Sequence, residues 1–431
     1  MRSSLPLATM IKNSTAINPS TGIPGPAAET DRLDSWKEIA NYLRREVRTV
    51  QLWEKREGMP VHRHFHQKLG SVYAFRREID TWKLSVSRQS AASAPAATAF
   101  KAAGHDKRRT SREAYLKGRY FWNQRSEEGL RKAIHWFESA MREDSDYALP
   151  YSGLADSLTL LSFYEIVSPP EVMPAARRAA QRAIELDPNS AEAHASLADV
   201  LLHFDRDWQA ADREYQRSIQ CNPDYALGYH WYANLLSARG QHDAARTAIM
   251  QALEINPVSI ITLVWAGVTS HLAHDFDEAI RHYQNALELD PDFMWAHMYK
   301  AQALEQKGDF KMALQEFETT SRLAGGNKCV KAMTAHAHAI AGDADSAREI
   351  LDELETPGSR QCTPSYDIAA TYAALGESKR MASWLNRACR ERNMKLFTLT
   401  QDPRFDPLRH SSEFRQIVEQ VGLSQFSPIR G

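Results

Sequence analysis

The chain has 431 residues, 43% of them hydrophobic and 25% charged, a composition typical of soluble globular proteins. No apolar run reaches the ~18 residues that a membrane-spanning helix needs, and the N-terminus resembles no signal peptide, so we expect no membrane anchor. The net charge of −1 hides a division: residues 1–112 carry 20 Lys and Arg against 10 Asp and Glu, and the remainder carries 33 against 44. A basic first part indicates a nucleic-acid-binding head, although two solvated surfaces of opposite sign would give the same counts.

Residues 1–30 are rich in Ser, Thr, Pro, Ala and Gly without periodicity, so we expect a disordered leader. Residues 31–86 predict a small domain of helix, turn, helix, two-stranded hairpin and helix. The first helix begins with a capping-box sequence, in which Ser35 accepts a hydrogen bond from the backbone of Glu38 and the Glu38 side chain reaches back. This order of elements is that of a winged helix-turn-helix domain.

Basic and polar side chains gather around the turn, the second helix and the hairpin of this domain. Guanidinium and ammonium groups neutralise phosphates, and the start of a second helix is where helix-turn-helix proteins touch base edges. The predicted DNA-binding residues are Arg44, Arg45, Arg48, Thr49, Gln51, Lys55, Arg56, Arg63, Lys68 and Arg76. A solvated basic face on a protein-binding domain is the alternative.

The segments RTVQLWEKREG (48–58) and GSVYAFRREID (70–80) resemble the DNA-binding head of MerR-type and excisionase-type regulators. The resemblance implies that the second helix enters the major groove and that the wing grips flanking backbone. Two positions depart from it. Arg44 stands where a glycine is usual, so it must adopt an awkward backbone or shift the turn. Leu52 stands where such regulators often place a polar or basic reader, so the operator sequence does not follow.

Candidate metal and catalytic residues are few. His62, His64 and His66 share one face of a predicted strand, but no further ligands follow at a recognisable spacing, so we predict wing packing or phosphate contact and no metal site. We predict neither an enzyme nor a cofactor, because no phosphate-binding loop, nucleophile elbow or zinc-protease motif is present. The cysteines lack metal or redox spacing, and we expect them in the core of a cytoplasmic protein: Cys221, Cys329, Cys362 and Cys389.

Residues 87–111 are rich in Ser and Ala and end near the basic run Lys107-Arg108-Arg109. This composition predicts a flexible basic linker. As a tether near DNA the basic run could add backbone contacts, and otherwise it keeps the linker soluble.

A repeat organises the rest of the chain. Apolar helical runs end at intervals of 35, 34 and 34 residues, at Asp187-Pro188, Asn222-Pro223, Asn256-Pro257 and Asp290-Pro291. A fixed period of this length, in units of two helices and a turn, resembles tetratricopeptide (TPR) repeats. We therefore predict a mainly α fold, with an α-solenoid of about seven to eight TPR units over 112–395 and a C-terminal cap and tail over 396–431.

The resemblance implies that the first helices of the units line a concave groove that binds a protein or peptide. The predicted groove residues are His230, Asn234, Val264, Val268, His271, Trp295, Met298 and Gln302. The Lys/Asn pair by which some TPR grooves clamp a C-terminal carboxylate is absent, since His230 takes the position of the partner of Asn234. Alternatively, these side chains pack against neighbours or against an inner-lying segment of the chain.

The sequence thus predicts a DNA-binding transcriptional regulator whose partners are double-stranded DNA and a protein or peptide in the TPR groove. A homodimer, if one is needed, would have to form through the repeats, because a linker takes the place of the dimerisation helix of MerR-type proteins. The alternative is a TPR scaffold or adaptor whose small N-terminal domain binds protein instead of DNA.

Overall fold

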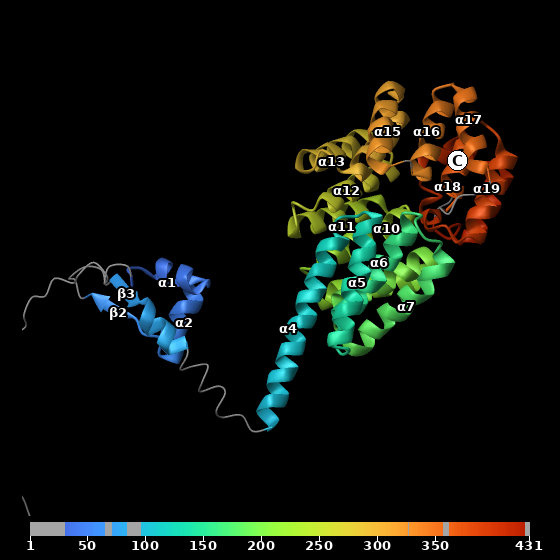
Figure 1. Ribbon diagram of the computed structural model, residues 1–431. Coiled ribbons are helices and arrows are strands. Elements are labelled where there is room, and N and C mark those ends of the chain that lie inside the picture. Colours follow the sequence, from blue (N-terminus) through green and yellow to red (C-terminus); the bar gives the residue numbers. More distant parts are fainter. Residues whose placement is uncertain (1–30, 65–70, 84–95, 326, 357–361, 427–431) are drawn as a thin grey trace, which may run out of the picture. The chain divides into compact units, whose positions relative to one another are not determined.

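The computed structural model describes residues 31–64, 71–83, 96–325, 327–356 and 362–426, and the chain forms two compact units, Met1–Ala103 and Gly104–Gly431 (Figure 1). The predicted leader, 1–30, lies outside the described residues, as do Lys68 and the hairpin turn at Leu69-Gly70. The two units are described separately below.

The first unit contains two helices, a small sheet and a last helical segment over 76–83. The elements are β1 (Arg32–Leu33), α1 (Trp36–Leu43), α2 (Val47–Glu57), β2 (His62–His64) and β3 (Ser71–Phe75). The strands are antiparallel in the order β1-β3-β2, with Leu33 opposite Ala74 and Arg63 opposite Val72. The predicted order of helix, helix, hairpin and helix is found, and the short strand β1 is an addition to it.

The start and the end of α1 follow from local side-chain and backbone chemistry. The Ser35 hydroxyl accepts the Glu38 N–H at 3.1 Å, as predicted, whereas the Glu38 carboxylate accepts the N–H of Asp34 at 2.9 Å. Arg44 ends the helix with φ 51° and ψ 48°, in the left-handed region that glycine occupies more easily. Its N–H returns to the carbonyls of Ala40 and Asn41. The awkward backbone expected at Arg44 is therefore present.

The second unit is a stack of helical hairpins, eight of them in the part of the chain that the structure describes, and the first helix of the first hairpin begins before Gly104, within the bounds of the first unit. They pair α4 (Ala96–Trp122) with α5 (Glu127–Glu143), α6 (Ala148–Phe163) with α7 (Pro169–Leu186), α8 (Ala191–Val200) with α9 (Trp208–Cys221), α10 (Ala226–Ala238) with α11 (His242–Ile255), α12 (Ile260–Leu272) with α13 (Phe276–Leu289), α14 (Met294–Gln306) with α15 (Phe310–Ala324), α16 (Lys328–Ile340) with α17 (Ala344–Glu355), and α18 (Ser365–Ala374) with α19 (Ser378–Arg390). A π-helical turn, η1 (Leu201–Asp205), continues α8.

The hairpins end where the sequence period places the Asp-Pro and Asn-Pro pairs. The side chains of Asp187, Asn222 and Asp290 each accept the backbone N–H two residues later, at 3.0, 3.0 and 3.1 Å. This turn satisfies polar groups at the helix end, and the following proline cannot continue the helix. The 34-residue period of the sequence is therefore the period of the hairpins.

One boundary differs from the prediction. Residues 96–111 were expected to belong to a flexible linker, but α4 begins at Ala96 and runs without interruption to Trp122. Alanine, lysine and arginine favour helices, and the helix is held at its C-terminal half by α5, where the buried Ser111 hydroxyl donates to the carbonyl of Ala140 at 2.8 Å. The flexible-linker prediction is therefore wrong for residues 96–111.

The C-terminal segment returns to the inner face of the stack. It consists of η2 (Met394–Thr398), η3 (Pro403–Leu408) and α20 (Ser412–Val421). η2 contacts η1, α6 and α10 from the early hairpins, near which the C-terminal elements lie in Figure 1. The Arg392 side chain donates to the carbonyl of Phe204 at 2.7 Å, and the Phe397 ring lies 4.6 Å from that of His203. The predicted capping helix is present as α20, packed on α19, but the segment before it is no simple link, because it fills the interior.

Candidate functional site

The first unit exposes a group of cations. Arg44, Arg45, Arg48, Lys55 and Arg56 are all exposed, and none forms an ion pair with another described residue. Thr49 and Gln51 are half-buried on the same helix. Arg63 instead binds Glu54 at 2.8 Å, and the Arg76 guanidinium lies 5.5 Å from the centre of the Tyr42 ring. Of the seven predicted DNA-binding cations that the structure describes, five therefore have no ion-pair partner and two, Arg63 and Arg76, are engaged within the unit.

His62 packs within the hairpin. Its Nε2 lies 2.7 Å from a carboxylate oxygen of Glu78, and its ring stacks on Tyr73 with 5.1 Å between the ring centres. His66 lies outside the described residues. The one cluster of three potential metal ligands found among the described residues contains none of these histidines.

The predicted groove residues lie on the inner face of the second unit, but they do not line an open groove. All except Trp295 are buried, and Trp295 is half-buried with its ring stacked on Tyr164 at 4.0 Å. His230 and Asn234 line one small pocket, Val268, His271 and Gln302 line a second, and Trp295 and Met298 line a third. Val264 is fully buried in the core. The groove is divided because Phe163, Tyr164 and the C-terminal segment occupy it.

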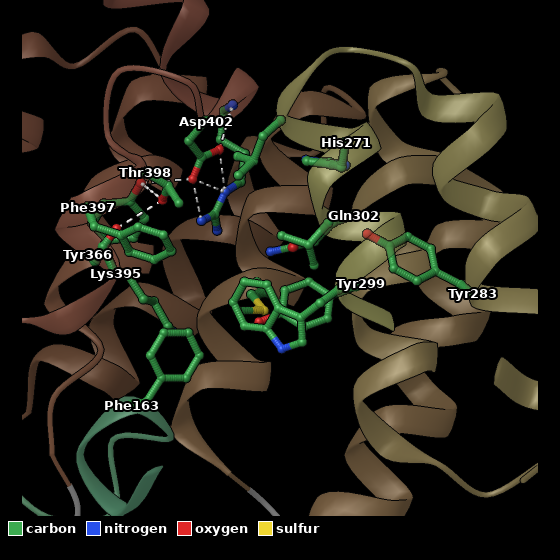
Figure 2. A pocket seen from close by; sticks show the side chains of 15 residues that line it. Phe163, His271, Tyr283, Tyr299, Gln302, Tyr366, Lys395, Phe397, Thr398 and Asp402 are labelled. Carbon is green, nitrogen blue, oxygen red and sulfur yellow. Dashed lines mark hydrogen bonds and ion pairs between the residues drawn. The ribbon is translucent and has the colours of Figure 1, made fainter. Parts of the chain in front are cut away.

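The second of these pockets, which we call the central pocket, has walls of aromatic, aliphatic and charged side chains. Figure 2 shows Lys395, Phe397 and Asp402 of the C-terminal segment on one side, across from Tyr299, Gln302 and His271 of the repeats. The space between the side chains is about 530 Å³, including space open to solvent, and about 60 Å³ of it admits the centre of a water-sized molecule. The pocket is therefore large enough for a few water molecules or a small ligand.

A buried network of charges holds the C-terminal segment against this pocket. The Arg404 guanidinium donates to Asp402 at 2.7 Å and to Asp367 at 2.9 Å, and the Lys395 ammonium lies 2.5 Å from Asp367. Burial alone would raise the pKa of the Asp402 carboxyl, but the Arg404 guanidinium beside it holds this pKa well below its usual range. Burial alone would lower the pKa of Arg404, but the carboxylates of Asp402 and Asp367 raise it well above its usual value. The network is thus a set of matched ions that joins α18 to η2 and η3.

A cluster beside this network has the residue types of a metal site. Single ligand atoms of Glu165, Cys329 and Asp367 all lie within 4.8 Å of one another. The Lys395 ammonium lies 3.5 Å from Glu165 as well as close to Asp367, so a cation of the protein itself already neutralises these carboxylates. Burial raises the pKa of the Glu165 carboxyl, and the nearby Lys395 ammonium partly offsets this effect.

Two buried polar atoms in the central pocket have no hydrogen-bond partner among the described residues. They are Nδ1 of His271 and the hydroxyl of Tyr283. Burial lowers the pKa of His271 to about 4, so its imidazole is neutral at physiological pH. The arrangement can therefore hydrogen-bond small uncharged polar molecules.

The sequence did not identify the residues that fill the inner face. Phe163 and Tyr164 fall in an insertion that breaks the repeat period, and Lys395, Phe397 and Arg404 follow the last repeat. One signal was available: the run KLFTL before Asp402 is too apolar for a link exposed to water. Among the helices that the structure describes, none has the length and apolar character needed to cross a membrane.

Models of tetratricopeptide repeats match residues 174–226, 214–247 and 274–308. The chain is 24% identical to Superkiller protein 3 of Schizosaccharomyces pombe over 277 residues, 64% of this chain and 17% of that protein. It is also 24% identical to Anaphase-promoting complex subunit 3 of the same organism over 143 residues, 33% of this chain and 21% of that protein. The chain thus spans about a fifth of the length of these relatives.

A similar solved structure is that of a tetratricopeptide repeat protein from Parabacteroides merdae. Its TM-score is 0.42 at 14% sequence identity, and the match covers 58% of this chain and 98% of that one. The sequence period, the stacked hairpins and the matched models agree on the nature of the second unit. This chain therefore contains tetratricopeptide repeats, arranged in a helical solenoid.

Proposed function

We propose that the solenoid is a protein-interaction module and that it binds its partner through its outer surface. The observation that carries the proposal is an exposed apolar pair on α4. Leu116 and Tyr120 lie one helical turn apart and are 56% and 65% exposed, while Ala114, Gly118 and Trp122 on the same helix are buried. The filled inner face supports the same choice, since a peptide would have to displace the C-terminal segment to bind there.

The position of α4 explains why its outer side is available. In a stack of hairpins each hairpin covers the apolar face of the next, and the terminal hairpins need a cover of their own. The last hairpin is covered by α20. Within the described part of the second unit, more than half of the surface of Leu116 and of Tyr120 remains uncovered. An amphipathic helix of a partner protein, with apolar anchors spaced by one turn, has the shape and chemistry to pack there.

The test compares full-length wild type with the double variant Leu116→Lys/Tyr120→Lys. Val258→Lys is the matched control, because Val258 is an apolar residue of the same unit that is 70% exposed. Quantitative mass spectrometry of proteins that co-purify from the native cells should show at least one partner recovered equally with wild type and control and strongly reduced with the double variant. The same proteins at the same levels in all three samples would rule out this surface.

A second function, binding of double-stranded DNA, is favoured by the five unpaired cations of the first unit. We infer that residues 31–86 are a winged helix-turn-helix head of the MerR and excisionase kind, and that the full chain is a transcriptional regulator. Some exposed arginines of the solenoid, Arg131 and Arg348 among them, do have carboxylate partners. Cations left without such partners are free to neutralise phosphates.

The DNA test is salt-dependent binding of the full-length protein to a random duplex. Arg44→Ala/Arg48→Ala/Arg56→Ala should flatten the slope of log K against log salt concentration by about 3, because each lost phosphate contact removes about one unit. Arg131→Ala, in the solenoid, should leave the slope unchanged. Absence of binding by the wild type at low salt would favour the scaffold alternative, in which the small unit binds protein.

A further inference from the structure

Arg125 lies buried in the turn between α4 and α5. It is 5% exposed, its φ of 52° is in the left-handed region, and its guanidinium lies 3.6 Å from the centre of the Trp122 ring. Its Nε and Nη2 have no hydrogen-bond partner among the described residues by geometry, and Tyr164 interacts with the same guanidinium. A buried guanidinium edge without acceptors is unfavourable, so it calls for an explanation.

The chain itself shows what this edge of an arginine binds. In Arg404 the same two atoms, Nε and Nη2, donate to the two oxygens of Asp402 at 3.1 and 2.7 Å. These donors are parallel and match the spacing of carboxylate oxygens, which is why arginine recognises carboxylates in a planar, two-bond arrangement. Arg404 has this partner within the protein. Arg125 has the same donors and no such partner within the described residues.

Arg125 lines a pocket that also includes Tyr164, His230, Trp231 and Asn234. The space between these side chains is about 380 Å³ including open solvent, of which about 30 Å³ admits the centre of a water-sized molecule. This room corresponds to two or three waters, or to a molecule about the size of acetate. We call it the Arg125 pocket.

The other charged groups near this pocket are already engaged. The Asp199 carboxylate accepts the Tyr215 hydroxyl at 3.1 Å and lies 3.2 Å from Nε2 of His203. Arg119 donates to Asp156 at 3.1 Å. Burial and Arg125 lower the pKa of His230 to about 3, so that imidazole is neutral. The positive charge of Arg125 is therefore the one that remains without a direct counter-ion in this pocket, as far as the described residues show.

We propose that the Arg125 pocket binds a small carboxylic acid, with the carboxylate held by Nε and Nη2 of Arg125 and the short carbon chain against Trp231 and Trp265. This site is separate from the outer surface of α4. It would make the solenoid a receptor for a small acidic molecule that binds between the early hairpins and the segments packed on them. The carboxylate at a peptide end has the same chemistry, but the room in the pocket favours a free acid of a few heavy atoms.

The test is titration of the full-length protein with sodium acetate, followed by tryptophan fluorescence, since Trp122, Trp231 and Trp265 lie around the site. Sodium chloride at equal ionic strength and acetamide, an uncharged molecule of similar size, are the matched probes. We expect saturable binding of acetate and at least tenfold weaker binding of acetamide. A response to acetate no different from that to chloride would overturn the proposal. Binding of triglycine without binding of acetate would also overturn it, and would assign the site to a peptide end.

Arg125→Lys keeps the positive charge but removes the paired donors, so it should weaken acetate binding at least tenfold. Arg131→Lys, on the exposed surface of α5, should not change it, and equal affinity of wild type and Arg125→Lys would count against the proposal. If Arg125→Lys does not fold, a crystal structure of the wild type grown in acetate provides the test. A carboxylate bound to Nε and Nη2 of Arg125 would support the proposal, and water alone at these atoms would overturn it. Leu116→Lys/Tyr120→Lys should retain acetate binding, which separates this test from that of the protein partner.

Discussion

At the scale of single residues, the packing of Phe137 shows how tightly the first hairpins meet. The ring lies between two glycines: a Cβ added at Gly153 would come within 2.5 Å of it, and one added at Gly118 within 2.4 Å. Because the ring is held from both sides, it cannot retreat from a methyl group. We expect Gly153→Ala to lower the free energy of unfolding by about 1–3 kcal/mol, measured by urea denaturation followed by circular dichroism. An unchanged midpoint and slope would show that the ring can move aside.

The buried charges of Arg404 allow a second prediction at this scale. Arg404→Met leaves Asp402 buried without its counter-ion, so we expect a loss of about 3–5 kcal/mol in the free energy of unfolding. Arg387→Met is the control, because the Arg387–Glu391 pair is at the surface, with side chains 40% and 37% exposed. That exposed pair should contribute less than about 1 kcal/mol. Similar losses in the two variants would mean that the buried network contributes no more than a surface ion pair.

At the scale of elements, two hairpins share an arrangement in which a histidine on the first helix bonds both to the proline turn before that helix and to the second helix of the hairpin. Nε2 of His194 lies 3.0 Å from the carbonyl of Pro188, and Nε2 of His297 lies 2.8 Å from that of Pro291. Nδ1 of each ring faces a glutamate on the second helix of its hairpin, Glu214 at 2.6 Å and Glu316 at 2.5 Å. The histidine thereby fixes the proline turn relative to the whole hairpin.

The His297–Glu316 pair should make the free energy of unfolding depend on pH. The hydrogen bond to Glu316 raises the pKa of His297 above 6.5, and despite burial His297 and Lys300 lower that of Glu316 below 4.5. Because the pKa of His297 is higher in the folded chain, its protonation stabilises the fold fully below pH 6.5, the unfolded pKa. This stabilisation is lost as the pH rises through the pKa of the folded state. Because the pKa of Glu316 is lower in the folded chain, its ionisation stabilises the fold fully above pH 4.5, the unfolded pKa. This stabilisation is lost as the pH falls through the pKa of the folded state. The pair is therefore most stabilising between about pH 4.5 and 6.5.

We expect His297→Ala to lower the free energy of unfolding by about 1–2 kcal/mol at pH 5.5 and by less at pH 8.5. Urea denaturation of wild type and variant at both pH values measures the two differences. Equal differences at pH 5.5 and 8.5 would mean that the protonated ring contributes no more than the neutral one.

At the scale of the whole solenoid, the C-terminal segment converts an open stack into one with a filled interior. Side chains from the first hairpin, such as Trp122 and Phe137, and from the C-terminus, such as Leu396 and Phe414, belong to one apolar cluster. A chain ending at Asn393 should therefore expose apolar inner surface. We expect it to bind the dye ANS, to melt at a lower temperature and to have a larger radius of gyration by small-angle X-ray scattering. A chain lacking only residues 427–431 is the control, and identical scattering from all three proteins would contradict the role of this segment.

The sequence alone determined the features that depend on near neighbours along the chain. The proline pairs marked the hairpin period because a helix end is decided by hydrogen bonds between residues two to four apart. Ser35 marked the start of α1, and Arg44 its strained end, for the same reason. The helical propensity of residues 96–111 is also local, but the Ser- and Ala-rich composition before it concealed the start of α4.

What only the tertiary structure decided is which inner surfaces remain accessible. Val268, His271 and Gln302 lie on the helices that the repeat pattern indicated, yet they are buried because residues after the last hairpin return to cover them. The same return of the chain brings Lys395 and Arg404 into ion pairs with Asp367. The two donors of Arg125 that have no partner among the described residues likewise could not be recognised from the sequence around Arg125. Such contacts join residues far apart in the chain and are selected by shape and charge in three dimensions, whereas a repeat pattern records only how each hairpin meets the next.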